Sequence, residues 1–103
     1  MDSLEEMLTL LRRILKDPSS RKVSVNLFLK CFFEKELDVK RSHGQAAAQI
    51  LSDLAYDLNF FVADHVVRAE EPSYFGDKRL VEEVEVALRR LSKIGIAISH
   101  RHY

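Results

Sequence analysis

Apolar residues recur every three or four positions along four segments of this chain, the spacing that gathers them on one face of an α-helix. The longest run extends from Ala47 to His65. Three glycines and two prolines in 103 residues leave little room for the many tight turns of an all-β fold. The spacing predicts helices over about residues 3–16, 25–37, 45–66 and 78–94.

Short polar links separate the four segments, so consecutive helices are expected to run antiparallel. We therefore predict an all-α fold: one domain over residues 1–103, built as an antiparallel four-helix bundle with a short C-terminal tail. Leu27, Cys31 and Phe33 widen the apolar stripe of the second segment beyond what one neighbouring helix would cover. That width predicts a second helix sandwiched between two others.

Candidate caps mark the ends of the expected helices. Ser3 with Glu6 three residues later has the capping-box pattern, and Ser24 is expected to cap the second helix, with Val23 as a hydrophobic staple. Asp77 is a candidate cap for the fourth helix. Gly95 predicts where that helix ends.

Charge is unevenly distributed in a chain whose formal net charge is zero. Residues 53–85 contain nine acidic and three basic residues, a net charge of −6, so the remainder carries +6. Helix dipoles explain part of this polarity, because acids favour the first turn of a helix and bases the last. They do not explain Asp64, near the end of the third expected helix, or Glu70 and Glu71 in the following loop.

One flank of the third expected helix combines acids with an aromatic residue. At about 100° per residue, Asp53, Asp57, Phe60 and Asp64 lie close together and away from the apolar stripe. A solvated face and a protein-binding surface both fit this pattern, although an aromatic anchor among acids suits a cationic partner. The expected partner-binding residues are Asp53, Asp57, Phe60, Asp64, Glu70, Glu71, Tyr74, Asp77 and Glu82. Basic residues between Arg12 and Lys22 are expected at the same end of the bundle, where they would neutralise part of this charge.

Catalytic and metal-binding patterns are missing from the sequence. The four histidines have no Cys, Asp or Glu at ligand spacing, and phosphate-binding loops and nucleophile motifs are absent. We expect no enzymatic activity and no cofactor. Basic residues at the end of the fourth helix suit its dipole, so direct nucleic-acid binding ranks last among the alternatives.

The sequence also bears on location. The single Cys31 cannot form an internal disulfide, which fits a reducing compartment. The N-terminal residues lack the pattern of a signal peptide, and no apolar run approaches the ~20 residues that span a bilayer. A cytoplasmic protein without membrane association is expected.

The order of several residues resembles the colicin D-type immunity proteins, a family that includes immunity proteins of contact-dependent growth inhibition systems. The resemblance spans about residues 4–92 and is carried by Val23-Ser24-Val25-x-x-Phe28, Ile50-Leu51-x-x-Leu54, Asp57-x-x-Phe60, Asp64, Arg68, Tyr74, Asp77, Leu80, Val84 and Leu88. It implies a small cytoplasmic helical bundle that binds a cognate nuclease toxin domain, tRNA-cleaving in the best-known case, and covers its cationic active site.

The resemblance places Asp57, Phe60, Asp64 and Asp77 at matching positions, whereas the other expected partner-binding residues rest on charge and exposure alone. Inhibition by acids that stand in for RNA phosphates and inhibition by steric block both remain open. The alternative function is a self-associating helical adaptor without a toxin partner. Such a bundle would use Leu27, Cys31 and Phe33 of the second helix as its homodimer face.

Overall fold

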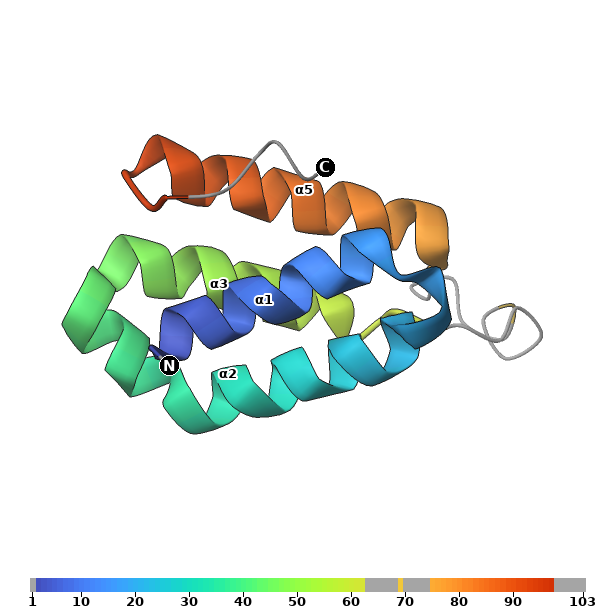
Figure 1. Ribbon diagram of the computed structural model, residues 1–103, viewed down its shortest axis with the longest axis horizontal. Helices are drawn as coiled ribbons and strands as arrows, with labels where there is room; N and C mark the ends of the chain where they lie inside the picture. The colour runs from blue at the N-terminus through green and yellow to red at the C-terminus, as the bar shows by residue number, and fades with distance from the viewer. Residues whose placement is uncertain (1, 63–68, 70–74, 98–103) are drawn as a thin grey trace.

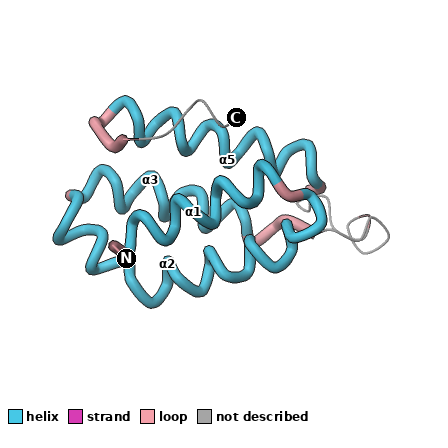
Figure 2. Tube along the Cα trace, viewed as in Figure 1, coloured by secondary structure: helices cyan, strands magenta, loops and turns pink. Residues whose placement is uncertain are grey.

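The computed structural model describes residues 2–62, 69 and 75–97, and these residues form four α-helices (Figure 1). The helices are α1 (Ser3–Lys16), α2 (Arg21–His43), α3 (Gln45–Leu58) and α5 (Asp77–Lys93), with a short 3-10 helix, η1 (Pro18–Ser20), between the first two. Figure 2 shows the same path as a trace dominated by helix. The predicted all-α, four-helix fold is confirmed.

Consecutive helices run in opposite directions along the long axis of the bundle (Figure 1). In the described part of the chain, α1 and α3 each pack against both α2 and α5, whereas α2 and α5 do not pack against one another and are linked at one end by the side chains of Arg21 and Asp77. The helices therefore occupy the corners of a square, with α2 diagonal to α5. The outward faces of these two helices consequently belong to opposite sides of the molecule.

One apolar stripe from each helix fills the core. Its largest fully buried apolar side chains are Met7, Leu11 and Ile14 from α1, Phe28 and Val39 from α2, Leu51 and Leu58 from α3, and Leu80, Val84 and Leu91 from α5. Each leucine, isoleucine or phenylalanine of this kind stabilises the fold by about 1.5–3 kcal/mol relative to an exposed position. The helical spacing that predicted the elements thus also identified the core.

The second helix is longer than the predicted 25–37. Ser24, the expected cap, is fully buried within α2, and the expected staple residue Val23 is exposed. The chain enters the helix four residues earlier because η1 leads directly into it and Asp17 caps η1 by accepting a hydrogen bond from the Ser19 N–H. Lys35 has non-helical backbone angles (φ −123°, ψ 15°), so α2 kinks there, close to the predicted end at 37, before it continues to His43. The helix packs on α1 and α3 as predicted, although Leu27 and Phe33, which widened its apolar stripe, are exposed.

The third helix is shorter than the predicted 45–66, because α3 ends at Leu58. Phe61 instead forms a β-bridge with Phe75: the Val62 N–H donates to the Phe75 carbonyl, and the Phe75 N–H donates to the Phe60 carbonyl, each at 3.0 Å. The rings of Phe61 and Phe75 lie 6.3 Å apart, and Phe75 is buried. Pairing with Phe75 therefore interrupts the expected helix at residues 59–62, and residues 63–66 lie outside the described part.

Side-chain capping distinguishes the first turns of α1 and α5. Asp2, in place of the expected Ser3, caps α1 by accepting a 2.9 Å hydrogen bond from the Leu4 N–H. That bond, followed by one to His43, lowers the pKa of Asp2. Asp77 is the first residue of α5 and makes no side-chain cap bond, so its predicted capping role is wrong.

At its other end α5 stops as predicted. Gly95 takes a positive φ of 95°, and the Ile96 N–H returns to the Leu91 carbonyl at 3.1 Å. A left-handed residue followed by such a bond is a common helix terminator. Ile96 then packs against the core, which begins the expected tail, whose residues 98–103 lie outside the described part.

Gly44 joins α2 to α3 with φ 95° and ψ 168°, a conformation that side chains strongly disfavour. Its N–H bonds to the Lys40 carbonyl, and its carbonyl accepts from the Ala48 N–H. We predict that Gly44→Ala lowers the free energy of unfolding by about 1–2 kcal/mol, measured by urea denaturation. The exposed Ser42→Ala change in the same turn is the control and should stay within about 0.5 kcal/mol of the parent. Equal stabilities of the two variants would contradict the strain assigned to Gly44.

Candidate functional site

Five of the nine expected partner-binding residues lie in the described part of the chain. Asp53 and Asp57 are on α3, Phe60 follows it, and Asp77 and Glu82 are on α5. The other four expected residues, Asp64, Glu70, Glu71 and Tyr74, lie outside the described residues. The structure therefore locates the surface along α3 and the first turns of α5, helices that lie side by side (Figure 1).

A narrow groove of about 30 Å³ runs between α3 and α5. Asp53 and Asp57 line it from α3, and Glu83, Val86 and Arg90 line it from α5. Both described acids of the expected α3 flank are therefore brought together in one groove. Asp57 is half-buried there, whereas Asp53 is exposed.

Glu83 brings a third carboxylate into this groove. Burial and a hydrogen bond with the Asp57 carboxyl, together with the negative charge of Asp57, raise the pKa of Glu83 above its usual 4.5, against the opposing effect of Arg79. Glu83 was not among the partner-binding residues predicted from the sequence. Its position next to the buried Val84 was the available signal, because a residue beside the apolar stripe of a helix borders the neighbouring helix.

Arginines pair with most of the other acids. Arg90 lies 3.3 Å from Asp53, and Arg79 lies 3.5 Å from Glu83. Arg21 of α2 lies 3.9 Å from Asp77, which agrees with the expectation that basic residues near the start of α2 share this end of the bundle. Asp53, Asp77 and Glu83 are thus each held in an ion pair, and Asp57 lies between Asp53 and Glu83 in the groove.

An aromatic pair flanks the acids on α3. Tyr56 is 67% exposed, and its ring meets the half-buried Phe60 ring edge-on with centroids 5.5 Å apart. Tyr56 was also missed from sequence, although it precedes Asp57 and sits one helical turn before Phe60. A half-buried ring supporting an exposed one presents a rigid apolar surface beside the carboxylates.

Asp77 and Glu82 meet in a second, more open hollow at the start of α5. With Gly76, Lys78 and Arg79 they line a volume of about 450 Å³. The Arg79 guanidinium lies 4.9 Å from the centre of the Phe75 ring and also reaches Glu83. Arg79 therefore connects this hollow with the α3–α5 groove.

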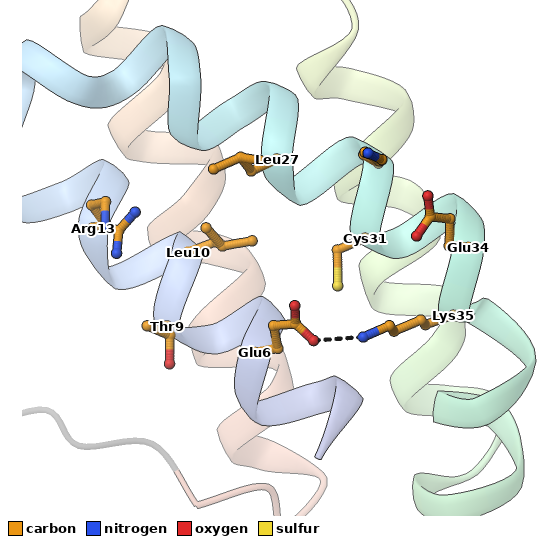
Figure 3. Close-up of a pocket in the computed structure, with 9 residues that line it drawn as sticks. Glu6, Thr9, Leu10, Arg13, Leu27, Cys31, Glu34 and Lys35 are labelled. Atoms are coloured by element: carbon orange, nitrogen blue, oxygen red, sulfur yellow. Dashed lines mark hydrogen bonds and ion pairs between the residues drawn. The ribbon is translucent and has the colours of Figure 1, made fainter. Parts of the chain in front are cut away.

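A separate groove of about 370 Å³ lies between α1 and α2 (Figure 3). Leu10, Leu27 and the buried Cys31 form its apolar part, and an ion pair of 2.7 Å between Lys35 and Glu6 crosses one end. Burial, followed by the negative charge of Glu6, raises the pKa of the Cys31 thiol. This cysteine therefore stays protonated at neutral pH and is poorly suited to nucleophilic chemistry.

The described residues also bear on metal binding and on membrane spanning. They contain no cluster of three or more His, Cys, Asp or Glu side chains arranged to hold a metal ion. No helix that the structure describes combines the length and apolar character needed to cross a membrane.

Comparisons with known proteins identify no relative of this chain. No protein-family model, no curated protein and no solved structure matches it. The resemblance to colicin D-type immunity proteins stays a prediction made from the order of residues.

The Asp57–Glu83 contact generates a stability prediction. Since the pKa of Glu83 is raised in the folded protein, like-charge repulsion acts fully above that pKa and is relieved as Glu83 takes up a proton on acidification. Asp57 also lies in the last turn of α3, where the helix dipole disfavours an acid. We predict that Asp57→Asn raises the free energy of unfolding by about 0.5 kcal/mol at neutral pH and that the gain fades toward pH 4.5.

Asp53→Asn is the matched control, one turn earlier on the same helix. It removes the ion pair with Arg90 and should lower stability by a few tenths of a kcal/mol at most. Urea denaturation of both variants across the acidic range makes the comparison. A loss of stability in Asp57→Asn at neutral pH would contradict the unfavourable contact.

Proposed function

We propose that this protein is an immunity protein that binds and neutralises a cognate bacterial nuclease toxin domain of the tRNA-cleaving type. The surface formed by α3 and the start of α5 meets the cationic active site of the toxin and excludes its RNA substrate. The protein acts by binding alone, and its partner is a basic protein domain.

The observation that carries this proposal is that the carboxylates of Asp57 and Glu83 face one narrow groove between α3 and α5. Two neighbouring carboxylates at a partly buried position weaken the free protein, and Asp57 adds an unfavourable charge at the end of α3. A lysine or arginine from a partner would convert this repulsion into attraction. Surfaces that sacrifice stability in this way are typical of functional sites.

The Tyr56–Phe60 pair supports the same surface. Interfaces concentrate binding energy in rigid aromatic side chains surrounded by polar groups that exclude water. Tyr56 is exposed beside Asp57, and Phe60 holds its ring from below at 5.5 Å. The combination offers an apolar anchor next to an attractive site for a cation.

The ion pairs on either side of Asp57 resemble the polar rim that surrounds the centre of a protein interface. Arg90 fixes Asp53 on one side, and Arg79 fixes Glu83 on the other. Bound arginines orient the carboxylates but also reduce the net negative charge. The pairing therefore favours local recognition of a few cationic side chains and a steric block of the toxin over a broad imitation of RNA phosphates.

A direct test begins with the tagged protein as bait in lysate of its source strain, with mass spectrometry of the proteins that co-elute at moderate salt. The expected result is one basic nuclease domain in equal proportion to the bait. That domain, once purified, should cleave tRNA, and addition of the protein should abolish the cleavage. Failure to recover a basic nuclease, or a recovered nuclease that stays active in the complex, would reject the proposal.

Tyr56→Ala should weaken binding of the recovered toxin domain about 30-fold, the loss of about 2 kcal/mol expected for an aromatic anchor. Surface plasmon resonance gives the dissociation constant. The control is Phe33→Ala on α2, because Phe33 is 64% exposed, nearly as much as Tyr56, but lies on a helix that does not pack against α5. Equal losses of affinity in the two variants would contradict a place for α3 in the interface.

Charge reversal tests separately how much the acids of this surface contribute to association with the toxin domain. The double change Asp57→Lys with Glu82→Lys should slow association with the toxin domain at least ~10-fold at low salt and reduce its salt dependence. Asp38→Lys with Glu36→Lys makes the same charge change at exposed positions of α2 and should leave association near the parental rate. Unchanged kinetics in the first variant would show that these acids do not steer the partner.

A further inference from the structure

The groove between α1 and α2 has no part in the proposed function. Its volume of about 370 Å³ is at the small end of the range for ligand sites, about 300–1,000 Å³. Because the four helices occupy the corners of a square, the α1–α2 side of the bundle is opposite the α3–α5 side. A ligand in this groove therefore leaves the surface proposed for the toxin domain uncovered.

The floor of the groove is apolar. Leu10 of α1 and Cys31 of α2 are buried there, and Leu27 of α2 is 42% exposed beside them. Figure 3 shows these three side chains at the junction of the two helices. The described residues that line the groove include no aromatic ring, so nothing there stacks on a flat ligand. This floor consequently fits an aliphatic chain.

Both carboxylates of the groove act on Lys35. Glu6 accepts a 2.7 Å hydrogen bond from the Lys35 ammonium. This bond, followed by the charge of Glu6 and more weakly by that of Glu34, raises the pKa of Lys35. The two acids therefore lie with their own cation at one end of the groove, where Figure 3 shows Glu6, Glu34 and Lys35.

Two further cations line the groove, one from each helix. Arg13 lies seven residues from Glu6 along α1, about 10 Å at 1.5 Å per residue, and Lys30 comes from α2. Both are exposed, and no ion pair among the described residues includes them, not even between Lys30 and Glu34 one turn away. Asp17, one turn beyond Arg13, is outside the lining and caps η1. An anion between the two helices therefore meets a cation on each side.

We propose that this groove binds an aliphatic carboxylate, with the carboxylate between Arg13 and Lys30 and the hydrocarbon chain on Leu10, Leu27 and Cys31. The two cations donate charge-assisted hydrogen bonds to the carboxylate from separate helices. The chain removes the apolar floor from water. This binding needs no toxin and is independent of the proposed function.

An NMR titration of the full chain with sodium octanoate tests the site, because amide shifts identify the residues near a bound ligand. We expect saturable shifts confined to the stretches of α1 and α2 that line the groove, with a dissociation constant of about 1 mM for so small a probe. Acetate has the carboxylate without the chain, and octylammonium has the chain with the opposite charge. Each should bind the groove at least ~10-fold more weakly than octanoate.

Removal of the two cations tests the charge. Arg13→Gln with Lys30→Gln should raise the dissociation constant of octanoate at least ~5-fold. Arg89→Gln with Lys93→Gln makes the same charge change at exposed positions of α5 outside the groove and should leave it unchanged. Circular dichroism confirms that both variants are folded.

Equal affinities for octanoate and octylammonium would overturn the proposal, as would equal effects of the two double variants. Shifts spread over α3 and α5 would contradict the location, and the absence of shifts at about 50 mM octanoate would reject binding altogether. Failure here is distinguishable from failure of the proposed function. The octanoate titration reports on the α1–α2 groove, whereas the Tyr56 variant reports on toxin binding at the opposite side of the bundle.

Discussion

Burial of one apolar stripe from each of four helices is the constraint on which the rest of the structure depends. The stripes of α1, α2, α3 and α5 meet around Leu11, Phe28, Leu51 and Leu80, all fully buried. Once these faces are buried, the rotation of each helix is fixed, and residues bordering a stripe must lie at a seam between helices. Asp57 and Glu83 line the same groove for this reason, since each borders its stripe along the seam of α3 and α5.

The sequence predicted helix positions where local signals decide them. The bounds of α1 agree with the predicted 3–16, and those of α5 differ from 78–94 by one residue at each end. The predicted end of α3 was wrong because Phe61 and Val62 continue the helical spacing of apolar residues but pair with Phe75, more than ten residues later. Periodicity contains no information about such a contact. The predicted capping role of Ser24 was also wrong, because a residue type that favours helix caps can occupy a buried position inside a helix.

The candidate surface was predictable in part. The shared flank of Asp53 and Asp57 follows from helical geometry and needs only the sequence. Their partners do not, because the pairing of Asp53 with Arg90 and of Asp57 with Glu83 depends on how α5 is placed against α3. Tyr56 was accessible to the same helical-wheel argument that selected Phe60. Tyr56 carries no charge, and the exposure of its ring follows from the packing of α3 rather than from the order of residues.

The α3–α5 surface and the outward side of α2 differ in their effect on the free protein. The carboxylates of Asp57 and Glu83 repel one another at neutral pH, and a cationic side chain of a partner would turn this repulsion into attraction. The outward side of α2 has no comparable conflict, because the exposed Phe33 rests edge-on against the core residue Phe32 at 5.8 Å. The charges at the seam of α3 and α5 therefore separate the candidate surface from an exposed face that only adds to the packing of its own helix.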